Sequence, residues 1–312
     1  MIGNSAMRIF LTGATGYIGS AVLDAGLRAG HSITALVRDP EKAEHVSQRG
    51  ATAIIGELSK PVSYAGAAEQ CDASIHTAFE QSKRGPNVDR QVIETLMGAA
   101  GRRIDAGRSA CVVYTSAVWV LGDTRGAATE DAPLNPTPHV AWRPEHEALL
   151  IEGSRGGQVR TAIVRPGIVY GGARGIIGDL LKDARNGLLR VVGDGRNHWP
   201  CVYDRDLADL YIRVVGTPDA SGVFHVNDEA DECVDDIVDA IGSHVRIRPD
   251  VRHVPITEAR AKMGAYADAL ALDQIVRSPR ARAIGWSPTL HSVAGNVARL
   301  LEEFRTAVDA AA

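Results

Sequence analysis

The segment Thr12-Gly13-Ala14-Thr15-Gly16-Tyr17-Ile18-Gly19 constrains the fold of this chain more than any other stretch. It follows a short apolar run, Arg8–Thr12, and precedes a helical pattern over Gly16–Ala29. The first glycine permits a tight turn, the second lets the backbone approach a ligand, and the third lets the helix pack closely on the strand. The helix N-terminus then presents free N–H groups and a positive dipole end to phosphates. The segment therefore predicts a dinucleotide-binding loop.

Strand and helix patterns alternate through the rest of the first half. The expected strands are Ser32–Val37, Thr52–Ile55, Ala73–Thr77, Ala110–Thr115 and Arg160–Arg165, and the expected helices are Pro40–Arg49 and a long one near Val88–Ile104. Strands separated by helices form parallel β-α-β units. We therefore expect an α/β fold with a doubly wound parallel sheet, Rossmann-like in its order.

The regular alternation of strand and helix patterns ends after Arg165, where Gly and Pro become frequent. Strand candidates become short (Leu189–Val192, Val223–Val226, Val251–Val254), and His291–Arg305 has helical spacing. We interpret this half as a smaller C-terminal substrate lobe. The expected division is a dinucleotide-binding domain over 1–165, with 199–228 returning to it, and a lobe made of 166–198 and 229–312.

Composition excludes several classes of function. The 312 residues carry a formal net charge of -4 without a long run of one sign, which argues against nucleic acid as the main partner. No stretch has the pattern of a signal peptide or a membrane span. The chain has four cysteines, Cys71, Cys111, Cys201 and Cys233, and no two of them have metal-ligand spacing. We therefore expect buried free thiols, no metal site and a cytoplasmic protein.

The residues after the second strand bear on which dinucleotide binds. An acidic side chain there binds a ribose 2′-hydroxyl and favours NAD, whereas a guanidinium can hold a 2′-phosphate through two hydrogen bonds. Arg38 stands at that position, directly before Asp39. The sequence favours NADP. The alternative is a solvated Arg38 with Asp39 as the ribose ligand, which leaves NAD possible.

Further motifs resemble those of the extended short-chain dehydrogenases/reductases, the NAD-dependent epimerase/dehydratase family. They are Gly56-Glu57-Leu58, Ile75-His76-Thr77-Ala78, Arg165-Pro166-Gly167-Ile168-Val169-Tyr170-Gly171, Asp206-Leu207-Ala208 and Ile284-Gly285-Trp286-Ser287-Pro288. We interpret Asp206 as a helix cap or salt-bridge partner. The resemblance implies a homodimer formed by the helices near 88–104 and 142–155. With the loop, it implies cofactor contacts from Gly13, Thr15, Gly16, Tyr17, Ile18, Gly19, Arg38, Glu57, Leu58, Thr77, Ala78, Thr115, Arg165, Pro166 and Gly167.

The catalytic motif departs from the family pattern. The family uses a Ser or Thr after the fifth strand and a Tyr-x-x-x-Lys helix, and this chain contains no Tyr-x-x-x-Lys. By spacing from Gly122, the serine position falls on Ala117 beside Ser116, the tyrosine position near Trp142 and the lysine position near His146. The following helix is expected to begin near Arg143, because Pro144 suits a first helical turn.

Three residues are candidates for the missing proton donor. His146 titrates in the right range, although a structural role is an equal alternative. Ser116 can hydrogen-bond a carbonyl oxygen unless the strand aims it at the core. Tyr170 offers a phenol, or serves only the architecture.

Three aromatic side chains are candidates for binding the substrate. Trp142 has no useful acidity and serves as a wall for substrate or nicotinamide, or as packing. His198 and Trp199, in the loop 193–200, bind substrate or belong to a surface turn.

Three hypotheses about function follow. The first is an NADP-dependent oxidoreductase or epimerase-like enzyme that acts on a small carbonyl or hydroxyl compound with an atypical proton donor. The second is a non-catalytic NADP-binding sensor or regulatory protein. The third is a redox-neutral isomerase or lyase with a resident cofactor.

Overall fold

The computed structural model describes residues 6–155 and 159–310, and the chain divides into two units whose segments alternate along the sequence. Unit 1 comprises the chain up to Ser116, Trp142–Arg165 and Ala208–Phe224. Unit 2 comprises Ala117–Ala141, Pro166–Leu207 and the chain from His225 onward. Because both units are discontinuous, each is described by itself below.

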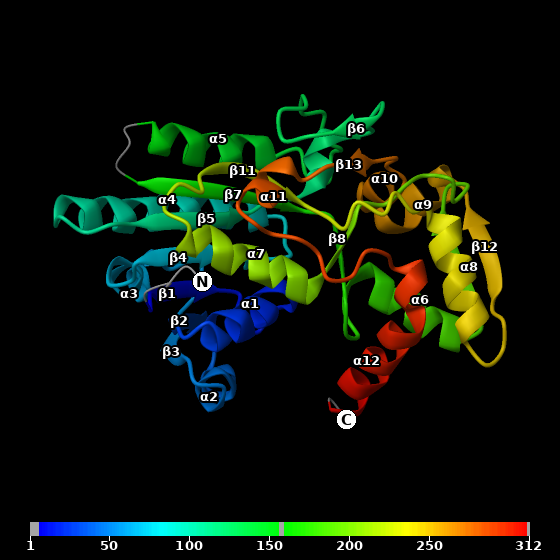
Figure 1. The fold of residues 1–312 in the computed structure, drawn as a ribbon, viewed down its shortest axis with the longest axis horizontal. Coiled ribbons are helices and arrows are strands. Elements are labelled where there is room, and N and C mark those ends of the chain that lie inside the picture. Colours follow the sequence, from blue (N-terminus) through cyan, green and yellow to red (C-terminus); the bar gives the residue numbers. More distant parts are fainter. Residues whose placement is uncertain (1–5, 156–158, 311–312) are drawn as a thin grey trace. The chain divides into compact units, whose positions relative to one another are not determined.

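Unit 1 is built on a seven-stranded sheet with the order β11-β7-β5-β4-β1-β2-β3 (Figure 1). Its strands are β1 (Arg8–Thr12), β2 (Ser32–Val37), β3 (Thr52–Ile55), β4 (Ala73–His76), β5 (Cys111–Thr115), β7 (Arg160–Pro166) and β11 (Gly222–Val226). From β3 to β7 every neighbouring pair is parallel. After β3 the chain returns to the other side of β1, so the strand order reverses between β1 and β4. This reversal is where ligands bind in doubly wound sheets, and the expected fold class is confirmed.

Helices cover both faces of this sheet. The helices of unit 1 are α1 (Tyr17–Arg28), α2 (Pro40–Gln48), α3 (Ala65–Glu69), α4 (Gly85–Asp105), α5 (Arg143–Ser154) and the larger part of α7 (Asp204–Gly216). Phe10 and Val112 of the sheet share one buried cluster with Leu96 of α4 and Leu150 of α5. On α1, a Cβ at Gly26 would lie 2.8 Å from Ile33 Cδ1 and 3.5 Å from Ile212 Cδ1 of α7. The cluster and this close approach place α1 and α7 opposite α4 and α5.

Unit 2 consists of helices and three short parallel strand pairs. The pairs are β8 (Ile168–Tyr170) with β10 (Cys201–Tyr203), β9 (Leu188–Val192) with β12 (Asp250–Val254), and β6 (Ala127–Ala128) with β13 (Ile275–Val276). The helices are α6 (Gly175–Arg185), α8 (Val234–His244), α9 (Ile256–Met263), α10 (Tyr266–Leu270), α11 (Pro279–Ala283) and α12 (Val297–Asp309). Leu181 of α6, Ile237 of α8 and Leu300 of α12 share one buried cluster. Three 3₁₀ turns complete the elements found within 6–155 and 159–310: Pro61–Ser63 and, in unit 2, Val118–Leu121 and Ala294–Asn296.

The unit boundaries differ from the expected domain division. The segment 117–141 was expected in the first domain, but Val118, Leu121 and Ala128 pack on Val276 of unit 2. The segment 199–207 was also expected there, but it groups with unit 2, where β10 pairs with β8. The two units are comparable in length, so unit 2 is not the smaller lobe that the sequence predicted.

Other expectations concerned membranes, metals and thiols. Of the helices within 6–155 and 159–310, none combines the length and apolarity that crossing a bilayer requires. The same residues contain no group of three or more His, Cys, Asp or Glu side chains arranged to hold a metal ion. All four cysteines are free, and only Cys233 is partly exposed.

Candidate functional site

The predicted dinucleotide loop is a tight turn between β1 and α1. Gly13 has a φ of +80°, and its carbonyl accepts the N–H of Gly16 at 2.7 Å. A Cβ at Gly13 would lie 2.8 Å from the nitrogen of Ala78, and one at Gly19 would lie 2.1 Å from the carbonyl oxygen of Gly13. Side chains at these positions would fill the turn or push α1 away. The loop therefore needs glycine for close approach, as the sequence predicted.

The loop is attached to the end of β4. The Thr77 hydroxyl donates to the carbonyl oxygen of Thr12 at 2.8 Å, and the Ala78 N–H donates to the Thr12 hydroxyl at 3.4 Å. Gly16 is the N-cap of α1, with no side chain to cap it, and the first turn of α1 has no acidic residue. This helix end keeps its positive character at the switch point of the sheet, which suits a pyrophosphate. Thr15, Tyr17 and Ile18 are partly exposed in the same turn.

The two residues after β2 have different surroundings. The Asp39 carboxylate caps α2, because it accepts the backbone N–H of Lys42 at 2.9 Å and the Lys42 ammonium at 2.6 Å. These hydrogen bonds to Lys42 hold the pKa of Asp39 below its usual value. Arg38 is exposed directly beyond the end of β2. Asp39 is thus committed to a helix cap, whereas the guanidinium of Arg38 is accessible to a phosphate.

The residues expected near the adenine follow β3. Glu57 is exposed and accepts a hydrogen bond from the Lys60 ammonium at 2.7 Å. The carbonyl oxygen of Leu58 accepts the Tyr64 hydroxyl at 3.1 Å, and its side chain packs on the apolar cluster under α3 and α4. The adenine contact of Glu57 and Leu58 stays an expectation.

A buried polar network centres on Asp89 of α4, which is 4% exposed. Its Oδ2 accepts the Tyr114 hydroxyl at 2.9 Å and lies 2.8 Å from His146 Nδ1. Its Oδ1 lies 3.2 Å from His76 Nε2. His76 Nδ1 in turn lies 2.7 Å from the Thr12 hydroxyl. Hydrogen bonds therefore connect the end of β1, where the glycine loop begins, to α5, where the sequence placed the altered catalytic motif.

The protonation of this network follows from its donors. Burial raises the pKa of Asp89, but hydrogen bonds from His146 and His76 outweigh it and hold that pKa well below its usual value. Burial raises the pKa of Tyr114 well above its usual value, so its hydroxyl stays protonated and donates to Asp89. Asp89 is a carboxylate and can only accept, so the His76 Nε2 that faces it carries a proton. The Nδ1 of the neutral ring then accepts from the Thr12 hydroxyl. Asp89 is a carboxylate surrounded by donors.

Trp142 and Arg143 begin α5 beside this network. The Trp142 indole stacks on Phe79 with ring centres 5.3 Å apart, and the Arg143 guanidinium lies 4.4 Å from the centre of the indole. Arg143 Nη1 donates to the carbonyl oxygen of Thr115 at 2.9 Å and to the Tyr114 hydroxyl at 3.2 Å. The Arg143 Nε is buried and has no partner among the described residues. The helix begins at Arg143, as Pro144 predicted.

The end of β5 carries Thr115 and Ser116. The Thr115 hydroxyl lies 2.8 Å from the carbonyl oxygen of His76 and 2.6 Å from the Tyr211 hydroxyl, so its hydrogen bonds are internal to unit 1. Ser116 is 3% exposed, and its hydroxyl has no partner among the described residues. A buried hydroxyl without a partner costs stability, and such groups in native proteins require an explanation.

The motif that begins at Arg165 makes contacts within the protein. Arg165 was expected to contact the cofactor, but it is 3% exposed and forms a two-pronged ion pair with Glu147, at 3.0 Å and 2.5 Å. Pro166 ends β7. A Cβ at Gly167 would lie 2.1 Å from the carbonyl oxygen of Pro200, so this glycine permits a close backbone approach within unit 2.

Two candidates of the second half, Tyr170 and Trp199, are committed to the interior of unit 2, whereas His198 is partly exposed. Tyr170 is 0% exposed and donates to Asp228 at 3.2 Å, so it offers no accessible phenol. Trp199 is 7% exposed in the core, and its indole N–H donates to the carbonyl oxygen of Leu270 at 3.0 Å. His198 Nδ1 lies 2.8 Å from Asp273 Oδ1. Loop 193–200 was expected to bind substrate because it carries polar and aromatic groups. The hydrogen-bond partners of His198 and Trp199, however, are Asp273 and Leu270.

Asp206 was expected to be a helix cap or a salt-bridge partner, but it lies within the first turn of α7 and its carboxylate binds the segment 289–290 instead. Its carboxylate accepts the N–H and the hydroxyl of Thr289, each at 2.7 Å. Its carbonyl oxygen accepts the indole N–H of Trp286 at 2.7 Å. The sequence missed Asp89, His76, Tyr114 and Arg143 as parts of a site. The signal available for Arg143 was its position at the start of α5.

The chain matches known proteins over most of its length. The model of the NAD-dependent epimerase/dehydratase family matches residues 9–227. An uncharacterized protein of Schizosaccharomyces pombe is 31% identical over 291 residues, which cover 91% of this chain and 95% of that protein. The 4-hydroxy-2-methyl-3-oxo-4-farnesyl-3,4-dihydroquinoline-1-oxide ketoreductase of Stigmatella aurantiaca is 27% identical over 266 residues, which cover 82% of this chain and 78% of that protein.

Solved structures share the fold at low sequence identity. Human epimerase family protein SDR39U1, solved with NADPH, superimposes with a TM-score of 0.76 at 20% identity, covering 95% of this chain and 99% of that one. The UDP-glucose 4-epimerase of Thermus thermophilus, solved with NAD, superimposes with a TM-score of 0.80 at 18% identity, covering 96% of this chain and 100% of that one.

Proposed function

The chain belongs to the NAD-dependent epimerase/dehydratase family, and we propose that it is an NADP-dependent oxidoreductase acting on a small carbonyl or hydroxyl compound. The observation that carries the choice of NADP is the contrast between Asp39, whose carboxylate caps α2, and Arg38, which is exposed beside it. The presence of NADPH in the structure of human SDR39U1 supports the same choice.

The residues of the cofactor site fit a dinucleotide. The glycine turn packs closely on the end of β4, where a Cβ at Gly13 would lie 2.7 Å from Thr77 Oγ1, and the uncapped N-terminus of α1 supplies N–H donors for a pyrophosphate. Arg38 holds the 2′-phosphate, and Glu57 and Leu58 flank the adenine. A bound reduced nicotinamide supplies a hydride for a carbonyl carbon. The protein must therefore deliver a proton to the carbonyl oxygen.

Two residues of unit 1 share that task. The Ser116 hydroxyl, which has no partner among the described residues, hydrogen-bonds the carbonyl oxygen of the substrate. His146 donates its Nδ1 proton to Asp89, which orients the ring, and its Nε2 passes a proton through water. Arg143 places a positive charge beside the same strand end and so stabilises negative charge on that oxygen. The ketoreductase of Stigmatella aurantiaca supports carbonyl reduction as the reaction class.

Calorimetric titration with NADPH and NADH tests the cofactor. NADPH binds more tightly than NADH, and Arg38→Ala weakens NADPH binding about 10- to 100-fold while leaving NADH binding unchanged. Arg28→Ala is the matched control, since Arg28 is an exposed arginine at the other end of α1. Equal affinities for the two nucleotides would overturn the choice of NADP.

A carbonyl screen that follows NADPH absorbance tests the reaction. For any compound that turns over, His146→Ala lowers kcat, because the variant lacks the group that passes the proton. Full activity of His146→Ala at every pH would show that this histidine is not the proton source.

One observation favours a second candidate, a non-catalytic NADP-binding regulatory protein. The indole that replaces the family's tyrosine stacks on Phe79, and the phenol of Tyr170 is enclosed in unit 2. Tight NADPH binding without turnover of any carbonyl compound would favour this candidate. A redox-neutral isomerase or lyase would instead copurify with its nucleotide and convert substrate without net oxidation of NADPH.

We also propose a homodimer formed by α4 and α5. The two helices contact each other in one chain, and Ile151 on α5 is an exposed apolar side chain. The solution mass at micromolar concentration measures this, and a monomeric mass would contradict it.

A further inference from the structure

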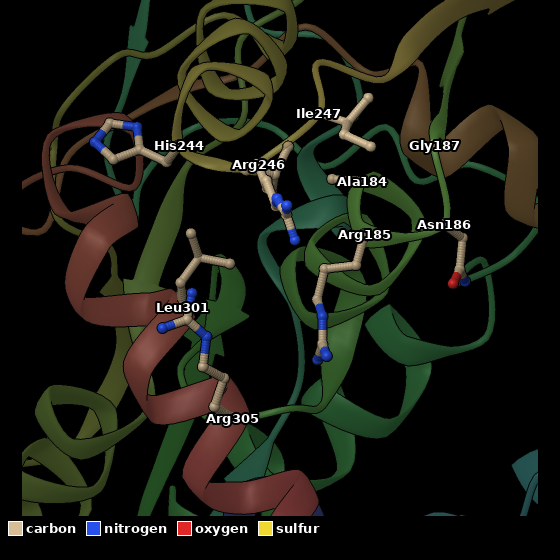
Figure 2. A pocket seen from close by; sticks show the side chains of 10 residues that line it. Ala184, Arg185, Asn186, Gly187, His244, Arg246, Ile247, Leu301 and Arg305 are labelled. Atoms are coloured by element: carbon tan, nitrogen blue, oxygen red, sulfur yellow. The ribbon is translucent and has the colours of Figure 1, made fainter.

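Unit 2 contains a cavity of about 500 Å³ that has no part in the proposed reaction (Figure 2). Its walls come from the C-terminal end of α6, the segment that follows α8, and one side of α12. The volume lies within the range of small-molecule sites in proteins. The cavity is formed by unit 2 alone, whereas the glycine loop and the buried network belong to unit 1.

Three arginines from three elements face this cavity. Figure 2 shows the side chains of Arg185, Arg246 and Arg305 extending into the same space. No acidic residue lines it, and within 6–155 and 159–310 no carboxylate pairs with any of the three. The next arginine along the loop, Arg248, lies outside the cavity and pairs with Asp239 at 3.3 Å. All three side chains are exposed, and the cavity brings them together without an acidic residue in its lining.

The helix ends account for only part of this charge. α6 and α8 both end at the cavity, and each C-terminus carries roughly half a negative charge. The two ends together offset about one of the three guanidinium charges. An excess of about two positive charges is left, which matches the charge of a dianion.

The other residues that line the cavity indicate which chemical group accompanies the anion. Ile247 is exposed and Val245 is partly exposed, and together they present an apolar surface next to the arginines. The Arg185 guanidinium lies 5.5 Å from the centre of the Phe304 ring, which restrains its position. His244 Nδ1 lies 2.8 Å from the carbonyl oxygen of Ala240, so this ring nitrogen is directed at the backbone of α8 and does not bind the anion.

We propose that this cavity binds a soluble phosphate monoester with a small apolar group. The phosphate, a dianion at neutral pH, is held by guanidinium groups that match its oxygen geometry. The apolar group lies against Val245 and Ile247. The site is separate from the proposed dinucleotide site, so the inference stands or falls independently of the proposed function.

Calorimetry with butyl phosphate tests the site, with inorganic phosphate and butanol as comparison probes. Butyl phosphate binds, inorganic phosphate binds more weakly, and butanol gives no saturable signal. Arg185→Gln and Arg246→Gln each weaken butyl phosphate binding by at least about tenfold. The matched control is Arg248→Gln, which removes the same charge from the same loop outside the cavity and leaves the affinity within about twofold.

Two outcomes would overturn the proposal. One is no saturable binding of butyl phosphate up to about 10 mM. The other is an equal loss in Arg248→Gln, which would mean that general surface charge attracts the probe. NADPH titration of the same variants separates the two proposals, because its affinity stays unchanged when only this cavity is altered.

Discussion

The Nδ1 of His146 lies 2.8 Å from the Oδ2 of Asp89, although the two residues are 57 positions apart in the chain. This contact fixes the ring of the histidine that stands near the family's lysine position. Asp89 also accepts the Tyr114 hydroxyl and faces His76, so one carboxylate orients groups from three other elements.

Asp89→Asn is expected to destabilise the protein by about 3 kcal/mol, because the amide places N–H donors against groups that already donate. Urea unfolding monitored by circular dichroism measures the change. Asp219→Asn is the control, since Asp219 is exposed and its loss should change stability by less than about 0.5 kcal/mol. Equal stability of the Asp89 variant and the parent would show that the network contributes nothing to folding.

Ser116→Ala is expected to raise stability by about 1 kcal/mol, because it removes a buried hydroxyl without a partner. If this hydroxyl binds the carbonyl oxygen, the same change lowers kcat by about 10- to 100-fold. Thermal unfolding and steady-state kinetics measure the two effects. Ser47→Ala on the exposed side of α2 should change neither. A gain in stability with unchanged kcat would assign Ser116 to structure alone.

Gly19→Ala is expected to cost about 2 kcal/mol and to weaken NADPH binding, because its methyl group would meet the carbonyl oxygen of Gly13 at 2.1 Å. Gly101→Ala in α4 is the matched control. Its methyl group meets nothing within 4 Å, and alanine in a helix stabilises by about 0.5 to 1 kcal/mol. Melting temperatures and NADPH titrations compare the two variants. A Gly19→Ala protein that binds NADPH normally would rule out the tight turn.

Stability is expected to depend on the charge of Asp228 in unit 2. Burial raises the pKa of Asp228 to about 7 from the usual 3.8. The folded state therefore holds this proton more tightly than the unfolded chain, so the contribution is complete below about pH 4 and is lost as the pH rises to about 7. Asp228→Asn removes the ionisation and keeps an oxygen for the Ala230 N–H.

The Asp228→Asn variant should be more stable than the parent by roughly 2 kcal/mol at about pH 8 and equally stable at about pH 4. Urea unfolding at the two pH values makes the comparison. Asp219→Asn should show no such dependence on pH. A constant difference between variant and parent would mean that Asp228 is ionised in the folded protein at both pH values.

The sheet could be predicted because its signals are local. The apolar run Arg8–Thr12, the glycines of the loop and the proline that begins α2 each specify structure within a few residues. Predicted and observed ends of the strands agree within one residue, as for β5 and β7. The parallel pairing of these strands followed from the alternation of strands and helices.

The site could be predicted only in part, because burial and distant pairing leave no local signal. Asp89 looks like one more polar residue of a long amphipathic helix, although it is buried against β5 and α5. Trp199 and Tyr170 look like ligand-binding groups for the opposite reason: their polar atoms suggest exposure, but Leu270 and Asp228 accept their hydrogen bonds inside unit 2. The place of 117–141 depends on β6 pairing with β13, far along the chain.

The interleaving of the two units has a consequence for how the protein is made. The chain passes from one unit to the other after Ser116, Ala141, Arg165, Leu207 and Phe224. During synthesis on the ribosome, the sheet of unit 1 lacks β11 until Val226 has emerged, and unit 2 is incomplete until α12 follows. Apolar strands are therefore exposed for most of translation, which makes the nascent chain a natural client of chaperones.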